Sequence, residues 1–152
     1  MNSSELKDFL IRQVLLMPDR DSNPDTSRLL AHISKTRLDK PLIYVGMTSC
    51  SYAAGARKTF DTISEYLSDY EIDADLVKGG CKGYCKAEPL VDIQLPGKAR
   101  IVFRNMTSEK VYPLLDEVLN YNIPGDNILG QYRNDIHQQW SSVPYIDEIP
   151  FF

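Results

Sequence analysis

The chain is poor in the residue types that most often carry chemistry: its 152 residues include three cysteines, two histidines and one tryptophan. An odd number of cysteines argues against a disulfide scaffold and leaves metal, redox or packing roles for the thiols. No apolar run approaches the roughly 20 residues that a bilayer-spanning helix needs, which excludes membrane insertion. The N-terminus, MNSSELKDFL, is acidic and amphipathic rather than basic and then apolar, so we expect no secretory signal and a cytoplasmic location.

An excess of basic charge is also missing. The chain carries 17 Lys and Arg against 21 Asp and Glu, a formal net charge of -4. Residues 1–106 hold 15 basic and 14 acidic side chains, whereas residues 107–152 hold 2 and 7. A nucleic-acid-binding protein needs a basic surface to neutralise phosphates, so nucleic acid is not an expected partner. The length and the 43% hydrophobic content are typical of one globular domain.

Residues 1–39 are predicted to form an N-terminal helical extension. Apolar residues recur at helical spacing in residues 4–17, where Pro18 ends the pattern, and again in residues 26–35. The stretch between them, PDRDSNPDTS, is polar and interrupted twice by proline, as loops are.

Residues 40–121 change to alternating strands and helices. The run PLIYVGM predicts a buried strand, and the apolar stripe of residues 54–69 predicts a long helix. Ile72, Ala74 and Leu76 alternate with aspartates and predict a second strand.

The rest of this region predicts a hairpin and a final helix. Residues 89–105 alternate in hydrophobicity on both sides of Pro96-Gly97, which suits a type II turn. Residues 107–121 predict a helix with either an irregular first turn or a kink at Pro113. The order β-α-β-β-β-α is that of a thioredoxin-like α/β sandwich, here preceded by helices. Residues 122–152 hold three of the nine prolines and predict an extended tail or linker.

The cysteines fall at one end of the predicted sheet. Cys50 follows the first strand in GMTSCSYAAGA, and Cys81 and Cys85 follow the second in VKGGCKGYCKAEP. Both loops are rich in glycine, which lets the backbone bend tightly and aim N–H groups at an anionic centre. Cysteines that only fill gaps in loops are the alternative interpretation.

Lysines crowd the second cysteine loop. Lys78, Lys82 and Lys86 would stabilise thiolates and balance a negative cluster. With Arg57 and Lys58 beside the first loop, they predict a locally positive face that steers an acidic redox partner. On this hypothesis, reversing Lys82 and Lys86 to glutamate slows association and leaves the melting temperature nearly unchanged. Ordinary solvated lysines are the alternative.

Three blocks carry a family resemblance. PLIYVGMTSCSYAAGARKTF, KGGCKGYCKAEPLVDIQLPG and VPYIDEIPFF resemble the N-terminal thioredoxin-like ferredoxin domain of NADH-binding flavoprotein subunits, those of NAD-coupled hydrogenases and complex I. The resemblance implies a ferredoxin domain over residues 40–121 and a linker over residues 122–152 that leads toward an absent flavin and NADH domain. It also implies electron transfer within a NADH-oxidising redox complex, with other subunits as partners and a homodimer as a candidate. FMN and NADH would bind only the downstream domain, so the chain would not be catalytic alone.

The resemblance also implies a cofactor. In cluster-binding members one [2Fe-2S] cluster is held by C-x4-C in the first loop and C-x3-C in the second. Cys50, Cys81 and Cys85 match three of these ligands, and the fourth cysteine position is Val45, which has no donor atom. Ser49 or Ser51 could supply a substitute oxygen, as could Tyr52. Two functions therefore stay open: a cluster-bearing electron-transfer domain, or a degenerate, cluster-free module that packs or docks within the same complex.

Two other uses of the cysteines are considered. The three cysteines with His32 or His137 would make a tetrahedral zinc site, although the spacing does not select one. Cys81 and Cys85 could form a dithiol switch, although C-x3-C lacks the geometry of a redox-active C-x-x-C.

Overall fold

The computed structural model describes residues 3–9, 11, 27–28, 30–31, 34 and 37–150. It divides into two compact units, Met1–Arg37 and Leu38–Phe152. In the first unit, α1 (Ser3–Phe9) lies within the first predicted helix, and residues 27–28 and 30–31 are helical within the second. Apart from residues 11 and 34, the remaining parts of both predictions, Pro18 included, lie outside the described residues. No helix in the described ranges has the length and apolar character of a membrane span.

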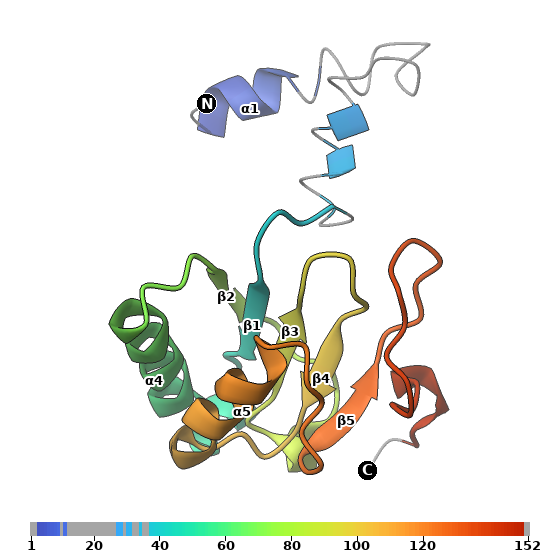
Figure 1. Cartoon of the computed structure of the whole chain (residues 1–152). Helices are drawn as coiled ribbons and strands as arrows, with labels where there is room; N and C mark the ends of the chain where they lie inside the picture. Colours follow the sequence, from blue (N-terminus) through green and yellow to red (C-terminus); the bar gives the residue numbers. More distant parts are fainter. Residues whose placement is uncertain are drawn as a thin grey trace. The chain divides into compact units, whose positions relative to one another are not determined.

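The second unit is built on a five-stranded sheet in the order β2-β1-β3-β4-β5 (Figure 1). β1 (Leu42–Gly46) and β2 (Asp75–Gly79) are parallel, and α4 (Ala56–Asp69) provides the crossover that parallel strands need. β3 (Val91–Gln94) pairs antiparallel with β1, β4 (Ile101–Phe103) with β3, and β5 (Ile128–Gln131) with β4. The predicted β-α-β-β-β-α order is confirmed, and β5 is an addition to it.

The second strand begins later than its alternation predicted. Ile72 N–H still donates to Leu67 O at 2.9 Å, which closes the end of α4, so Ile72 cannot join the sheet. Asp75 N–H donates to Pro41 O at 2.9 Å and opens a register that pairs Leu42 with Asp75 and Gly46 with Gly79. Parallel pairing therefore starts only where the chain has left the helix.

The hydrophobic pattern left the start of the last helix undecided, and it did not predict the short helix before α4. Residues Ser108–Lys110 form a 3-10 turn, η4, and α5 begins at Val111 and ends at Val118. Pro113 lies in the first turn of α5, where backbone N–H groups have no intrahelical partner, so the irregular first turn is the observed alternative. A short helix, α3 (Ser49–Ala53), precedes α4, and Gly55 separates the two with a φ of +96°.

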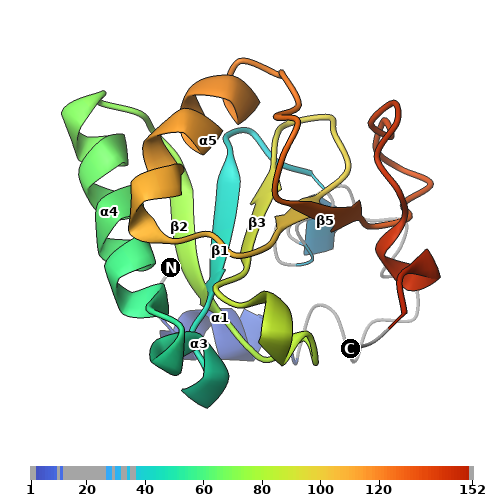
Figure 2. The same ribbon diagram turned by 90° about the horizontal axis from the view of Figure 1, so that it is seen from below.

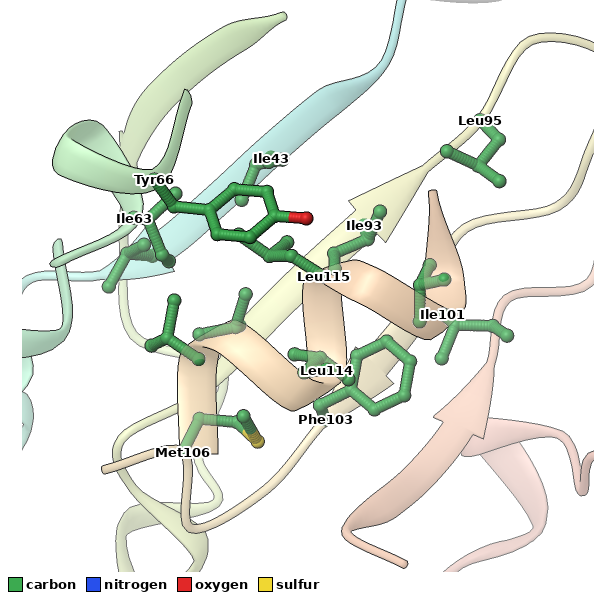
Figure 3. Packing of buried hydrophobic residues seen from close by; sticks show 14 of the residues in the cluster. Ile43, Ile63, Tyr66, Ile93, Leu95, Ile101, Phe103, Met106, Leu114 and Leu115 are labelled. Atoms are coloured by element: carbon green, nitrogen blue, oxygen red, sulfur yellow. The ribbon is translucent and has the colours of Figure 1, made fainter. Parts of the chain in front are cut away.

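Helices α4 and α5 cover one face of the sheet, and the main hydrophobic core lies beneath them (Figures 2 and 3). Ile101 and Phe103 of β4 face this core, whereas Val102 between them faces the other side. A second, smaller core covers that side. It is formed by Tyr84, Ala87, Leu90, Val102 and Leu129, with Tyr132, Ile146 and Ile149 packed against it.

The segment predicted as a linker contributes to both cores. Besides β5, Trp140 is only 8% exposed, and its indole N–H donates to Ala99 O at 2.8 Å. The buried Gln131 amide donates to Trp140 O and Val143 O at 3.0 and 2.7 Å, and its oxygen accepts from Trp140 N–H at 2.8 Å. One glutamine side chain thus holds residues 140–143 in place without regular secondary structure.

Candidate functional site

The three cysteines come together at the end of the sheet where β1 and β2 finish. Cys50 lies in α3, Cys81 follows β2, and Cys85 begins a 3-10 turn, η3 (Cys85–Ala87). Figure 2 shows α3 and this turn at the same end of the strands. Backbone bonds fix the arrangement, because Met47 N–H donates to Gly79 O and Gly46 N–H to Leu90 O, each at 3.0 Å.

The thiols of this cluster are free and exposed, and they influence one another. Hydrogen bonding and charge at Cys50 raise the pKa of Cys85, with a further increase from desolvation, while a hydrogen bond to Cys81 opposes the rise. Gly83 N–H donates to Cys81 Sγ at 3.4 Å from a residue with a φ of +84°. The loop therefore aims a backbone donor at a sulfur atom, as its glycine content predicted.

Val45 faces away from this cluster. It is completely buried, packs in the main core with Ile43 and pairs with Val91 across the sheet. Because side chains alternate along a strand, the next residue, Gly46, lies on the opposite side of β1. A Cβ atom on Gly46 would lie 3.2 Å from both carboxylate oxygens of Glu88 and 3.2 Å from Ser51 Oγ. The position of β1 that faces oxygen donors, at close range, is thus Gly46.

The oxygen donors near Cys50 differ in their surroundings. Ser49 is exposed, Tyr52 is 49% exposed, and Ser51 is fully buried with its hydroxyl 3.1 Å from Thr48 Oγ1. Glu88, which the sequence analysis did not single out, is buried, and its Oε2 accepts a hydrogen bond from Leu90 N–H at 2.8 Å. Its only sequence signal is an acidic residue three positions after a cysteine.

The donor set fits an iron–sulfur centre only in part. Three thiols are the soft ligands that such clusters take, but Val45 offers no fourth donor. Among the described residues, no group of three or more His, Cys, Asp or Glu side chains is arranged to hold a metal ion. The chain's own thiols are brought near one another, but the described residues do not complete a set of four donors.

No histidine in the described part of the chain lies near the thiols to complete a zinc site. His32 lies outside the described residues. His137 precedes Gln138, whose N–H donates to Gly97 O at 3.0 Å in the β3–β4 turn. That turn follows the end of β3, whereas Val91 at the start of β3 pairs with Val45 at the cysteine end. His137 therefore lies at the opposite end of the sheet from the thiols.

A buried ion pair anchors the second cysteine loop to the sheet. Lys82 Nζ lies 3.2 Å from Asp92 Oδ2, and Arg100 Nε lies 3.9 Å from the same oxygen. Asp92 is fully buried, and the Lys82 side chain is 19% exposed. The Arg100 guanidinium lies over the rings of Tyr44 and Tyr132, 5.1 and 4.5 Å from their centroids. Burial raises the pKa of Asp92, and the positive charges of Lys82 and Arg100 oppose that rise.

The predicted lysine face is therefore not uniform. Lys82 is paired with a buried carboxylate, so its reversal to glutamate is now expected to lower the melting temperature. Lys78 Nζ lies 5.5 Å from the ring centroid of Phe60. Lys86 is exposed and forms no ion pair within the described residues, which leaves it available for steering.

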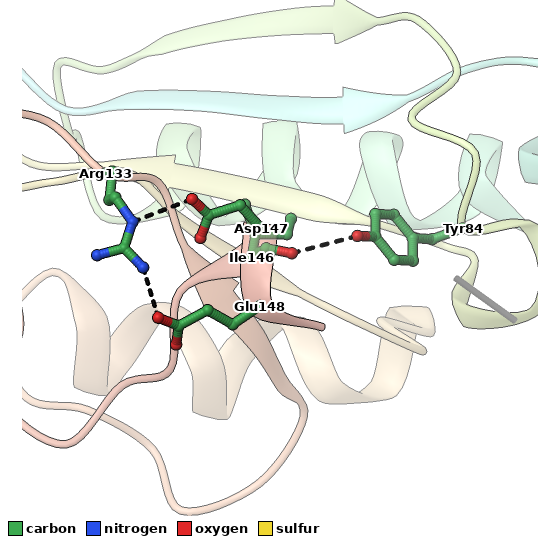
Figure 4. A network of polar contacts seen from close by, with 5 residues as sticks. All are labelled: Tyr84, Arg133, Ile146, Asp147 and Glu148. Atoms are coloured by element: carbon green, nitrogen blue, oxygen red, sulfur yellow. Dashed lines mark hydrogen bonds and ion pairs between the residues drawn. The ribbon is translucent and has the colours of Figure 1, made fainter. Parts of the chain in front are cut away.

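The C-terminal segment closes over the same loop. Tyr84 OH donates to Ile146 O at 3.3 Å, and Arg133 pairs with Asp147 and Glu148 on η5 (Ile146–Glu148) (Figure 4). A cavity of about 460 Å³ lies between loop and segment. It is lined by Lys82, Tyr84, Tyr132, Ile146, Asp147 and Ile149.

The sheet order, with α4 and α5 on one face, defines a thioredoxin-like α/β fold. Two solved structures of a thioredoxin-like [2Fe-2S] ferredoxin from Aquifex aeolicus have the same fold, with TM-scores of 0.53 and 0.51 at 13% and 14% identity. They cover 64% and 60% of this chain and 96% and 98% of their own.

A curated relative connects the chain to hydrogenases. The NADP-reducing hydrogenase subunit HndB of Solidesulfovibrio fructosivorans is 29% identical over 94 residues, which are 61% of this chain and 75% of that subunit. No protein-family model matches the chain. The predicted resemblance is confirmed: the chain has the thioredoxin-like fold of these [2Fe-2S] ferredoxins and is similar in sequence to a NADP-reducing hydrogenase subunit.

Proposed function

We propose that the chain is an electron-transfer domain of a multi-subunit hydrogenase or NADH-oxidising complex, and that Cys50, Cys81 and Cys85 hold one [2Fe-2S] cluster. The observation that carries the proposal is the convergence of three exposed thiols, with Cys85 next to both others. The hydrogenase relative and the ferredoxin neighbours support it.

The same proposal gives each part of the chain a role and places the flavin and nicotinamide sites in a different domain. Residues 40–121 form the ferredoxin domain, and residues 122–152 lead toward a flavin domain that binds FMN and NADH. The chain does not catalyse a reaction alone, acts in the cytoplasm, and has other redox subunits or a second copy as partners.

A bound [2Fe-2S] cluster supplies reversible one-electron transfer. The chain itself contributes thiolates, the Gly83 N–H directed at Cys81, and the Lys82–Asp92 pair that fixes the loop between two of the ligands. A hydrogen bond to a ligating sulfur and a nearby positive charge both stabilise added negative charge at such a centre.

A cluster-free docking module is the second candidate. The buried, donor-free side chain of Val45 favours it, as does the lack of a complete ligand group among the described residues. The same contacts that hold the cysteine loops would then serve only to shape a surface for the neighbouring subunit.

Anaerobic reconstitution of the full chain with ferrous iron and sulfide separates the two candidates. We expect a brown protein with about two irons and two sulfides per chain, and an electron paramagnetic resonance (EPR) signal after dithionite reduction. Cys85→Ser should weaken cluster binding, and Ser142→Ala is a surface control. A colourless protein with iron far below stoichiometry would establish the docking module.

A further inference from the structure

Three tyrosine rings meet at the end of α4, beside the neighbouring helix α5 (Figure 2). The ring centroid of Tyr66 lies 4.6 Å from that of Tyr70 and 5.0 Å from that of Tyr112, and the latter two are 6.4 Å apart. Tyr66 is buried and Tyr112 is half-buried, whereas Tyr70 is 57% exposed. The cluster therefore has a packed base and one ring that is open to solvent.

Carboxylates hold two of the tyrosine hydroxyls. Tyr66 OH donates to Asp116 Oδ1 at 2.6 Å, and Tyr112 OH donates to Asp69 Oδ2 at 3.2 Å. Burial, the bond to Asp69 and the negative charges of Asp69 and Glu65 raise the pKa of Tyr112. Both hydrogen bonds join one helix to the other, so the rings and carboxylates are ordered before any partner arrives.

The carboxylates stand where helix stability does not favour them. Glu65 and Asp69 are four residues apart on α4, a spacing at which like charges repel. Asp69 and Asp116 lie in the last turns of α4 and α5, which contain no basic residue and carry the negative end of the helix dipole. Positions that break such local rules tend to be functional.

These charges are also uncompensated. Within the described residues, Glu65, Asp69 and Asp116 form no ion pair, whereas Asp61, earlier on α4, pairs with Arg57 at 3.3 Å. The surface beside the exposed Tyr70 ring is therefore negative.

A cationic side chain of another protein suits this surface. A guanidinium or ammonium group binds over a tyrosine ring within about 6 Å of its centroid, and carboxylates accept its N–H groups. The described residues include no group of three or more His, Cys, Asp or Glu arranged for a metal ion. A second copy joined through the same face would bring Glu65 and Asp69 against identical charges.

We infer that the exposed face formed by Glu65, Asp69, Tyr70, Tyr112 and Asp116 is a docking surface for an arginine- or lysine-bearing segment of another subunit. The inference rests on the proposed function for the existence of that subunit, and it requires no cluster. Arginine matches the surface better than lysine, because its planar group stacks on a ring while its N–H groups bond to a carboxylate.

The test measures binding of a helical, alanine-based peptide of about 15 residues with arginine at every fourth position. The same peptide with glutamine in place of arginine is its control. Binding to the full chain is followed by NMR chemical shifts at about 20 mM salt, where surface charges are weakly screened. Thermal melts of each protein variant report the fold.

The protein variants separate the surface from net charge. Glu65→Gln with Asp69→Asn removes two charges and keeps an acceptor for Tyr112 OH. Asp126→Asn with Asp135→Asn removes two charges from exposed positions outside the surface. Tyr70→Ala removes the open ring, and Tyr70→Phe keeps it.

We expect the arginine peptide to shift amide signals of residues 65–70 and 112–116, and the glutamine peptide to leave them unchanged. The association constant should fall about fivefold in Glu65→Gln with Asp69→Asn and less than about twofold in the charge-matched control. Tyr70→Ala should lower it about threefold, and Tyr70→Phe should match the parent.

Three results would overturn the inference: no shift at these residues, equal losses in the two double variants, or a dimer of the parent that Tyr70→Ala dissociates. If these occur in a chain that takes up a full cluster on reconstitution, the inference fails alone. A chain that takes up no cluster but binds the peptide as expected supports the inference and overturns the cluster proposal.

Discussion

Val45 and Gly46 are neighbours in β1 with opposite surroundings, and this contrast changes which substitution should complete the ligand set. Gly46→Cys is expected to raise bound iron after reconstitution, because its thiol leaves β1 on the side of Glu88 and Ser51 and not in the main core. The 3.2 Å contacts require both the Glu88 carboxylate and the Ser51 hydroxyl to shift. Val45→Cys, the choice that the family spacing suggests, places its thiol in the core and should leave iron uptake unchanged. Iron analysis of both reconstituted variants tests this prediction. A gain in bound iron in Val45→Cys alone would contradict the placement of the added thiol at Gly46.

Lys82 should matter for stability although it lies in an exposed loop. Lys82→Met keeps the aliphatic stem but leaves Asp92 with Arg100 as its remaining cation, at 3.9 Å. We expect a loss of about 1–3 kcal/mol in the free energy of unfolding, below the full cost of an unpaired buried charge. Lys86→Met, four residues along the same loop, is the matched control and should melt with the parent. Equal melting temperatures for the two variants would argue against the anchoring role.

The raised pKa of Asp92 predicts a direction for the pH dependence of stability. A carboxyl whose folded pKa exceeds its unfolded value stabilises the fold below the unfolded pKa, and this contribution is lost as the pH rises through the folded pKa. Asp92→Asn cannot titrate. The variant should therefore gain stability relative to the parent as the pH rises above about 4, the ordinary pKa of an aspartate. Urea midpoints of both proteins across this range test the sign. Burial and the charge of Glu88 raise the pKa of Asp92, whereas Lys82 and Arg100 lower it. The opposite trend would mean that the effect of Lys82 and Arg100 is the larger one.

The C-terminal segment packs closely against Gly130 of β5. A Cβ on Gly130 would lie 3.0 Å from Pro144 O and 3.1 Å from Ile146 N and Cα, all backbone atoms that cannot rotate away. Gly130→Ala should destabilise the protein by about 1–3 kcal/mol and speed proteolysis after residue 132. Gly125→Ala is the matched control, because nothing lies within 4 Å of its Cβ. Unchanged proteolysis in Gly130→Ala would show that the segment adapts.

The elements that hydrophobic pattern predicted are those with regular periodicity and one buried face. β1, α4, the β3–β4 hairpin and α5 were all identified from spacing alone. β5 and the segment after it could not be, because they depend on Gln131 and Trp140, whose partners lie 9 to 41 residues away. Side chain to backbone bonds of this kind leave no local pattern in a sequence.

The position of the cysteines could be predicted from the sequence, but the surroundings of Val45, Gly46 and Asp92 could not. The cysteine spacing pointed to one end of the sheet, and the structure places the thiols there. The choice between Val45 and Gly46 needed the strand's register and its two faces. Asp92 alternates with apolar residues as an ordinary surface carboxylate would, so its burial became visible only once the loop and the C-terminal segment covered that side of the sheet.

For the whole molecule, we expect neither NADH nor FMN to bind the isolated chain. No G-x-G-x-x-G or P-loop sequence occurs in it, and such loops supply the backbone N–H groups that hold a dinucleotide's phosphates. Titration calorimetry with each ligand should show no binding tighter than about 1 μM. A measured dissociation constant below that value would relocate the nicotinamide or flavin site to this domain.

The seating of the C-terminal segment also decides which border of the sheet can recruit other chains. Gln131 N–H is taken by Pro144 O at 2.8 Å and Gln131 pairs with Tyr145, so the outer rim of β5 is partly occupied. Within the described sheet, β2 has a strand neighbour on one side, and its Asp75 and Lys78 place charge along that rim. Charged rims resist strand addition, whereas an uncovered β5 would offer unpaired amides beside apolar residues. By covering part of the β5 edge, the C-terminal segment should also reduce edge-to-edge aggregation.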